Sequence, residues 1–217
     1  MKNIYIYCEG QTEEIFINEV LYPYLFNFGV AVYPIICTTK RTGAKKYKGG
    51  VSDYNKIKKE LTIICKSHKN EYVTTMFDYY AMPDNTPGID CQEPDLMKRM
   101  NEIEKVITAD IGAANCKFHF MVHEFEGILF SKPESFYLIA EEEIVSDILK
   151  IRKEYLTPEY INNSFETAPS KRLEALIPRY AKIKNGTLIS KDMGIDKILA
   201  ECPHFREWIE QISHLGT

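Results

Sequence analysis

The stretch NIYIYCEGQTEE, residues 3–14, decides how this chain folds. Its first half, from Asn3 to Cys8, is a compact run of β-branched and aromatic residues that is typical of a buried strand. The run stops at Glu9, and Thr12 can cap a helix whose first turn carries two glutamates at the positive end of the helix dipole. The stretch therefore predicts a strand that leads directly into a helix, with Glu9 at the junction.

The same alternation of strand and helix continues to about residue 130. Further strands are predicted at Val30–Cys37, Glu71–Phe77 and Lys117–Val122, and the segments between strands carry apolar residues three or four positions apart. Crossovers of this length imply an α/β fold with a mainly parallel, four-stranded sheet and helices on both faces. In such sheets the ligand binds outside the carboxyl ends of the strands, so the residues that follow each strand are the candidates for function.

From Pro133 onward no strand pattern recurs. Helices are predicted there at Ile144–Tyr155, Pro169–Ile177, Asp196–Cys202 and Phe205–Leu215. We therefore expect an α/β domain over residues 1–132 and a helical C-terminal region over residues 133–217 that packs on it. Trp208 is expected in the core.

Composition excludes several classes of protein. Of 217 residues, 45% are hydrophobic and 27% are charged, which is ordinary for a globular protein and argues against disorder, collagen or a coiled coil. The net charge of −4 is not that of a polybasic nucleic-acid binder, and no apolar run reaches the roughly 20 residues that span a bilayer. None of the six cysteines lies close enough to another to form a zinc-knuckle pair, and no signal-peptide pattern opens the chain, so we expect a reduced, cytoplasmic protein with no membrane contact.

Two carboxylates follow predicted strands. Glu9 ends the first strand and Asp78 ends the third, so both should project from the same edge of the sheet. Oxygen ligands of this kind suit a hard divalent cation such as Mg²⁺, which usually keeps several waters. The alternative is that both are solvated loop acids or helix caps.

Four stretches carry a resemblance to a known family. Cys8–Glu14 looks like the E-G-x-T-E-E signature that opens many Toprim-type domains, and Thr75–Tyr80, His123–Phe130 and Pro169–Leu173 also match. Together they resemble a bacterial Toprim-like family of unknown function, which is usually encoded beside ATPases and is suspected of roles in anti-phage defence. This family is similar to the Toprim nuclease domains of overcoming-lysogenization-defect systems. The H-E-F-E run that begins at His123 is the most specific part of the match.

The resemblance implies a Toprim-like fold with a site for Mg²⁺ (or Mn²⁺). In that fold a Glu after the first strand and an Asp-x-Asp after the third strand coordinate the ion for phosphodiester chemistry, and Glu9 and Asp78 match the first two positions. Tyr80 stands where the second Asp is expected, so another acid would have to replace it. Of the acids available, which are Asp84, Asp90, Glu124 and Glu126, the first choice is Glu126, because it follows the fourth strand at the same edge.

The H-E-F-E run also has a chemical interpretation of its own. The unperturbed pKa of histidine is close to neutrality, so His123 could act as a general acid or base beside a leaving group. Alternatively, His123 and Glu126 form a hydrogen-bonded pair that supports the loop. The run is not the zincin motif, which needs a second histidine four residues after the first.

One segment is strongly basic. Between Thr38 and Lys59 eight basic residues face a single acid, Asp53, and glycines there would let the backbone approach phosphates. The residues that we expect to bind nucleic acid are Lys40, Arg41, Lys45, Lys46 and Lys48, with Lys171 and Arg172 as a second group from the helical region. The alternative for both groups is ordinary solvated surface. No Walker A motif is present, so ATP hydrolysis by this chain is not expected.

These features lead to a Mg²⁺-dependent nuclease as the first hypothesis, with Glu9, Asp78, His123 and Glu126 as catalytic residues. It could be the effector of an anti-phage system with an ATPase partner. A second hypothesis is a non-catalytic regulatory or binding subunit of an ATPase complex, which the tyrosine at position 80 favours. A third is a small-molecule phosphotransferase or hydrolase that uses the same edge of the sheet.

Overall fold

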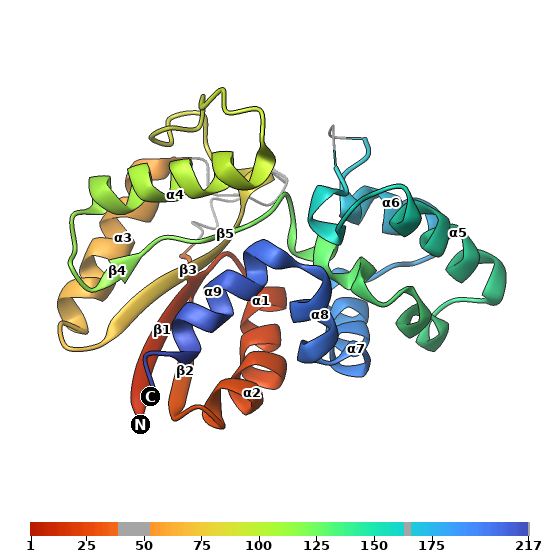
Figure 1. Ribbon diagram of the computed structural model, residues 1–217, viewed down its shortest axis with the longest axis horizontal. Coiled ribbons are helices and arrows are strands. Elements are labelled where there is room, and N and C mark those ends of the chain that lie inside the picture. Colours follow the sequence, from red (N-terminus) through yellow and green to blue (C-terminus); the bar gives the residue numbers. More distant parts are fainter. Residues whose placement is uncertain (39–52, 163–165, 217) are drawn as a thin grey trace, which may run out of the picture.

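A parallel β-sheet lies at the centre of the protein, as seen in a computed structural model that describes residues 1–38, 53–162 and 166–216 (Figure 1). Three long strands form the order β2-β1-β3, and two short strands, β4 and β5, both pair with β3 in the same direction. The bounds of the strands are β1 Lys2–Cys8, β2 Val30–Ile36, β3 Tyr72–Asp78, β4 Cys116–Lys117 and β5 Phe120–Met121. The predicted α/β fold class, with a parallel sheet and a helical C-terminal region, is confirmed.

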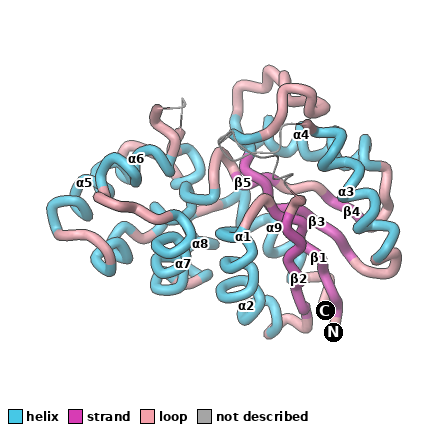
Figure 2. Tube along the Cα trace, turned by 180° about the vertical axis from the view of Figure 1, so that it is seen from behind, coloured by secondary structure: helices cyan, strands magenta, loops and turns pink. Residues whose placement is uncertain are grey.

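Helices cover both faces of the sheet because side chains alternate along each strand. Along β1, Ile4 and Ile6 point into one hydrophobic cluster, and Tyr7 points into another. The first cluster is closed by the N-terminal helices and by α9, and the second by α3 and α4 (Figures 1 and 2). The bounds are α1 Gln11–Phe16, α2 Tyr22–Phe26, α3 Tyr54–Ser67, α4 Leu96–Ile111 and α9 Pro203–Ser213.

The first helix differs from its prediction at both ends. Its N-cap is Gly10 rather than Thr12, and the Glu13 side chain accepts a hydrogen bond of 2.9 Å from the Gly10 N–H. Between α1 and α2 the chain forms a π-helical turn over Ile17–Leu21. Pro23 explains the wide turn, because it has no N–H to donate and its ring would clash with the carbonyl four residues earlier.

The region after β5 is helical, as predicted, and joins the core of the sheet. Ile148 and Leu173 belong to the same hydrophobic cluster as Ile4 of β1. Trp208, which we expected in the core, is buried in this cluster. No helix of the described residues is long and apolar enough to cross a bilayer. The helices of this region before α9 are η3 Phe125–Ser131, η4 Pro133–Leu138, α5 Glu142–Lys153, η5 Pro158–Tyr160, α6 Pro169–Leu176, α7 Lys182–Met193 and α8 Ile195–Glu201, and one further short helix, η2 Tyr79–Ala81, follows β3.

The helix α7 is absent from the sequence-based prediction. Its sequence, KIKNGTLISKDM, has a glycine in the middle and few apolar residues, so its amphipathic pattern is weak. The helix forms because Ile189 and Met193 are buried in the first hydrophobic cluster. Tertiary packing therefore overrides a poor local propensity.

The predicted fourth strand, Lys117–Val122, also differs in the structure, because the chain forms two short strands, β4 and β5, with a break between them. The Thr75 hydroxyl accepts a hydrogen bond from the His119 N–H and donates one to the His119 carbonyl, both at 2.8 Å. On either side of His119, the Phe118 N–H donates to Thr108 and the Phe120 N–H donates to Glu104. Side chains thus replace the ladder bonds of a continuous strand, and every N–H of the break has a partner.

Replacing Thr75 by valine removes the hydroxyl without changing the shape of the side chain. The His119 N–H and carbonyl would then be buried without partners, at a cost of about 1–3 kcal/mol for each group. We expect the free energy of unfolding in urea to fall by ~2–4 kcal/mol.

The control is Thr62→Val, since Thr62 bonds only to a carbonyl of its own helix, and it should cost much less. Equal losses in the two variants would show that Thr75 does not hold the broken strand.

Candidate functional site

Glu9 and Asp78 lie side by side at the carboxyl edge of the sheet. The register of β1 and β3 pairs Cys8 with Met76, so the residues that follow emerge together. Asp78 Oδ1 accepts a hydrogen bond of 2.8 Å from the Phe125 N–H, and this bond brings the start of η3 to the same edge. The structure therefore places both predicted carboxylates next to each other at the carboxyl edge of the sheet, beside the segment that contains Glu126.

Three more acids surround this pair, and all three are buried. Glu13 comes from α1, Glu124 is the N-cap of η3, and Glu126 lies in the first turn of η3. Glu124 accepts a hydrogen bond of 2.9 Å from the Ser170 N–H at the start of α6, and Glu126 lies 3.4 Å from the ammonium of Lys182 at the start of α7. We call these five acids and Lys182 the acidic edge.

Burial first, and repulsion between the acids second, make the carboxylates of the acidic edge hard to ionise. Burial and then the charge of Glu13 raise the pKa of Glu9 to about 7, and burial and then Glu9 raise the pKa of Asp78 well above its usual value. Burial also raises the pKa values of Glu13 and Glu126. These carboxylates therefore resist ionisation in the absence of additional positive charge.

Lys182 supplies part of that positive charge. Burial by itself would lower its pKa, but the carboxylates of Glu126, Glu124 and Asp78 outweigh this effect and raise it. The lysine is therefore protonated at neutral pH. One ammonium cannot offset five carboxylates, which is why the pKa values of Glu9, Asp78, Glu13 and Glu126 remain raised beside it.

The donor set of the acidic edge fits a hard divalent cation. Every acidic ligand offers carboxylate oxygens, which Mg²⁺ and Mn²⁺ prefer, and the backbone donors described above fix their orientation. Tyr80 brings no carboxylate, and its ring is exposed in η2. Glu126, the acid that we expected to replace it, does lie with Glu9 and Asp78, and so do Glu13 and Glu124.

His123 follows β5 but is not paired with Glu126. Within residues 1–38, 53–162 and 166–216, no hydrogen bond or ion pair joins the two side chains. The backbone of His123 has a φ of 65°, in the left-handed region that favours glycine. Burial and then Arg99 lower its pKa to about 4, so at neutral pH the imidazole is neutral, with one N–H and one acceptor nitrogen.

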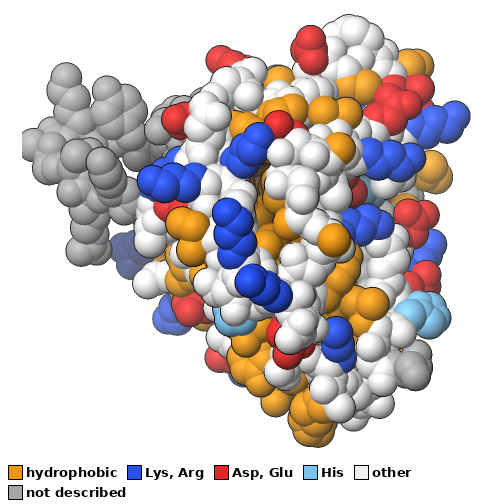
Figure 3. Space-filling view, turned by 90° about the vertical axis from the view of Figure 1, so that its left-hand side faces the viewer, with side chains coloured by type: hydrophobic (Ala, Val, Ile, Leu, Met, Phe, Trp, Pro, Cys, Tyr) orange, Lys and Arg blue, Asp and Glu red, His pale blue; other side chains and the backbone are white. Residues whose placement is uncertain are grey.

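The basic residues divide into two groups. Lys40, Arg41, Lys45, Lys46 and Lys48 lie outside the described residues. In the second group, Lys171 forms an ion pair with Glu174, and the Arg172 guanidinium donates to the Thr167 carbonyl and the Tyr155 hydroxyl. The face seen in Figure 3 shows Lys and Arg side chains scattered among apolar surface rather than gathered into one patch.

Sequence reasoning missed Glu13 and Lys182 as members of the site. The sequence predicts Glu13 at the positive end of a helix dipole, and it places Lys182 among basic residues that either contact a phosphate backbone or form ordinary helix surface. The signal for Glu13 is its spacing of four from Glu9 across the strand–helix junction. Lys182 has no such signal, because only the packing of α7 brings it to the acids.

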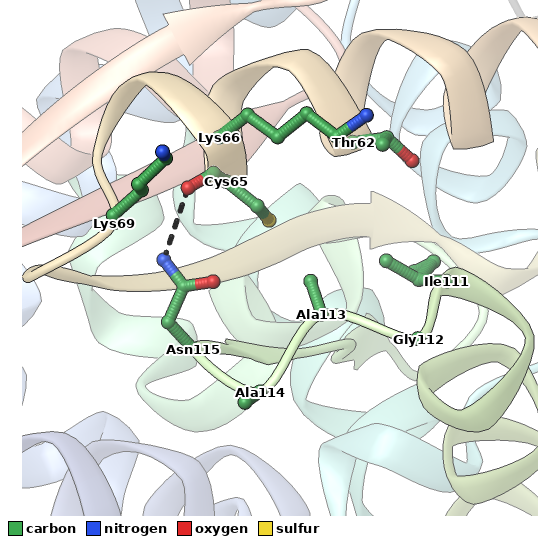
Figure 4. Close-up of a pocket in the computed structure, with 9 residues that line it drawn as sticks. All are labelled: Thr62, Cys65, Lys66, Lys69, Ile111, Gly112, Ala113, Ala114 and Asn115. Atoms are coloured by element: carbon green, nitrogen blue, oxygen red, sulfur yellow. Dashed lines mark hydrogen bonds between the residues drawn. The ribbon is translucent and has the colours of Figure 1, made fainter.

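Two features lie away from the acidic edge. An open cavity of about 460 Å³ lies between the ends of α3 and α4, at the opposite edge of the sheet, where Asn115 donates to the Cys65 carbonyl (Figure 4). A buried group of Glu104, His119 and His204 has ligand atoms within 4.8 Å of one another and could hold a metal ion.

Glu9→Gln should show the repulsion directly in protein stripped of metal. The pKa of Glu9 is about 7 in the folded chain against 4.5 in the unfolded chain, so the charge lowers the free energy of unfolding as the pH rises from 4.5 to 7. Removing it should leave stability nearly unchanged at pH 5 and raise it by about 1–3 kcal/mol at pH 8.5, measured by urea unfolding in chelator.

Glu154→Gln, which neutralises an exposed acid after α5, is the control and should change little at either pH. If the effect of Glu9→Gln did not depend on pH, the raised pKa would be wrong.

Comparison with known proteins gives a family. No curated protein matches this chain. Among solved structures, the C-terminal region of the Burkholderia pseudomallei OLD protein is similar at 15% sequence identity and a TM-score of 0.49, over 99% of this chain and 98% of that chain. Residues 8–213 match the family described as Domain of unknown function (DUF4276). Because that match spans nearly the whole sequence, the chain belongs to the DUF4276 family.

Proposed function

We propose that this chain is a Mg²⁺- or Mn²⁺-dependent enzyme that cleaves phosphodiester bonds of nucleic acid. The observation that carries the proposal is the convergence of Glu9, Asp78 and Glu126, with two further acids and Lys182, at the carboxyl edge of a parallel sheet. Buried like charges destabilise one another, so a bound cation would stabilise this arrangement. The E-G-x-T-E-E and H-E-F-E stretches that resemble Toprim nuclease domains support the same chemistry.

Four residues of the acidic edge take part in the reaction in this proposal. Glu9, Asp78 and Glu126 would hold the ion, which when bound would polarise a phosphoryl oxygen and offset its charge. The N–H groups of Phe125 and Gly10 keep carboxylates of the edge oriented. Protonated Lys182 adds a positive charge where an anionic phosphate would approach the acids.

His123 takes a role that differs from the first expectation. With a pKa of about 4 it is unprotonated at neutral pH, so it would accept a proton from the attacking water rather than protonate the leaving oxygen. A proton for the leaving oxygen would come from Lys182 or from solvent.

The position of the basic segment in the sequence supports nucleic acid as the substrate. Lys40, Arg41, Lys45, Lys46 and Lys48 come after β2, whose last residue Ile36 pairs with Cys8 directly before Glu9. The strand that precedes the segment therefore ends at the acidic edge. Clustered lysines that follow this strand in the sequence would neutralise the phosphates of a nucleic acid.

The biological setting is the finer part of the proposal. The resemblance to Toprim-like proteins encoded beside ATPases supports an effector of anti-phage defence that acts with an ATPase partner. The tyrosine at position 80 instead favours a second candidate, a regulatory or binding subunit without catalysis of its own, because an expected ligand of the ion is absent.

The first experiment combines metal binding and cleavage. Mn²⁺ and Mg²⁺ should bind the wild-type chain in calorimetry, and the chain should cleave DNA or RNA only with the metal. Glu9→Gln, Asp78→Asn and Glu126→Gln should each lose cleavage and weaken binding, because each removes a charged oxygen ligand. Glu154→Gln, far from the acidic edge, should retain both.

Failure of the wild type to bind metal at millimolar concentration would overturn the proposal in favour of the non-catalytic subunit. Cleavage that survives in all three variants would place the catalytic site elsewhere.

Lys182→Met tests whether the positive charge of Lys182 takes part in the reaction. Loss of a positioned cation near the developing negative charge should lower kcat/KM by a factor of about 10²–10³. Lys184→Met, two residues along the same exposed helix start, is the matched control and should have little effect. Equal rates in the two variants would exclude Lys182 from the reaction.

A further inference from the structure

A second cluster of metal-ligand side chains lies away from the acidic edge, where β4 breaks from β5. Glu104 comes from α4, His119 from the break itself, and His204 from the start of α9. All three side chains are between 3% and 7% exposed. The cluster thus joins the helix layer on one face of the sheet to the helix layer on the other.

The three ligand atoms converge on one point. Glu104 Oε1 lies 2.9 Å from His204 Nε2 and 3.2 Å from His119 Nδ1, and all three atoms are within 4.8 Å of one another. Ligand atoms of a tetrahedral ion at about 2.0–2.2 Å lie about 3.3–3.6 Å apart, which is close to the two distances from Glu104 Oε1. The spacing therefore allows one small ion to contact all three.

Neighbouring groups hold these side chains in position. The Phe120 N–H donates to Glu104 Oε1 at 2.8 Å, and Trp208 stacks on the His119 ring with 4.4 Å between ring centroids and 7° between planes. The Trp208 N–H in turn donates to the Thr74 hydroxyl at 3.0 Å. Second contacts of this kind orient the ligands of known metal sites and are part of how such sites bind.

The cluster also has an unfilled requirement. In the described part of the chain, His119 Nε2 is buried and has no hydrogen-bond partner. A cavity of about 20 Å³ opens among Glu104, His119 and His204, with Asn101, Glu207 and Gln211 nearby. That volume has room for about one water molecule. The spacing above uses Nδ1 of His119, so the unpaired Nε2 shows only that the hydrogen bonds of the cluster are incomplete, and the cavity is the space that an added ligand could occupy.

The ligand chemistry selects the ion. Two imidazole nitrogens and one carboxylate oxygen suit Zn²⁺, whereas Mg²⁺ takes oxygen ligands. The cavity would supply a water as the fourth ligand of a tetrahedral site. Because it has no room for a substrate, the ion would serve structure rather than catalysis.

We propose that Glu104, His119 and His204 bind one Zn²⁺ ion, separate from the acidic edge, which fastens α9 to α4 and to the broken fourth strand. The proposal does not depend on the proposed nuclease function, since it concerns a different donor set in a different place. An ion there would raise the stability of the folded chain, because the three elements come together only on folding.

The test uses the whole chain, stripped with chelator and titrated with Co²⁺ in excess Mg²⁺. Mg²⁺ occupies sites with oxygen ligands, so Co²⁺ at the nitrogen-containing site should give the intense visible absorption of tetrahedral cobalt. One equivalent of Zn²⁺ should abolish this absorption, and Zn²⁺ alone should raise the Tm. Zinc retained after gel filtration should approach one ion per chain by mass spectrometry.

Variants assign the signal to residues. His204→Asn and Glu104→Gln should lose the cobalt absorption, while His214→Asn, at the exposed end of the same helix α9, should keep it. Glu126→Gln should also keep it, because it alters only the acidic edge.

Two outcomes would overturn the proposal. One is a wild-type chain that is folded by circular dichroism yet gives neither cobalt absorption nor retained zinc; the cluster would then be a hydrogen-bonded network alone. The other is cobalt absorption that persists in folded His204→Asn, which would place the ion elsewhere. The wild-type titration decides the first question even if a variant fails to fold.

Discussion

Parallel pairing of β1 with β3, in the register that sets Cys8 beside Met76, is the constraint on which the acidic edge depends. It makes Glu9 and Asp78 leave the sheet as neighbours, in a place where burial limits their hydration. Neither carboxylate is free to turn away, since Asp78 is tied to the Phe125 N–H and Glu9 follows a strand that is buried on both faces. Their raised pKa values measure the electrostatic cost of this arrangement. With amides in place of Glu9 and Asp78 the folded chain would avoid this unfavourable electrostatic energy and be more stable. Carboxylates that lower stability in this way are typical of functional sites.

The rest of the site limits that cost without removing it. Backbone N–H groups of Gly10 and Ser170 stabilise Glu13 and Glu124, and Lys182 adds the positive charge that Glu126 needs. Lys182 arrives only because α7 packs closely on α1 and η3. A Cβ on Gly186 of α7 would lie 3.6 Å from the Phe125 ring and 3.7 Å from Thr12, so larger side chains there would push the helix away. A Cβ at these distances makes ordinary contacts, so position 186 needs a small residue, glycine or alanine, for α7 to lie this close.

At the break between β4 and β5, side-chain hydrogen bonds replace the backbone bonds of a continuous strand. Thr75, Thr108 and Glu104 satisfy the N–H groups between β4 and β5, and the interruption turns His119 toward Glu104 and His204. Burial lowers the pKa of His119 to about 4, although Glu104 opposes this. Burial would likewise raise the pKa of Glu104, but His119 and His204 outweigh it and lower the pKa to about 2. A buried carboxylate is therefore kept ionised at the junction of the two helix layers, where it can hold both histidines.

The sequence by itself determined the strands β1 to β3, because compact apolar runs bounded by polar junctions are a local signal. It also determined that Glu9 and Asp78 would share an edge, since parallel strands with helical crossovers end on the same side. It could not predict the break in the fourth strand, where the hydroxyl of Thr75 on a neighbouring strand competes with the ladder. Nor could it predict the place of Lys182 or the meeting of Glu104, His119 and His204. Those positions depend on how helices distant in the sequence pack against one another, and only the tertiary structure decides which side chains that packing brings together.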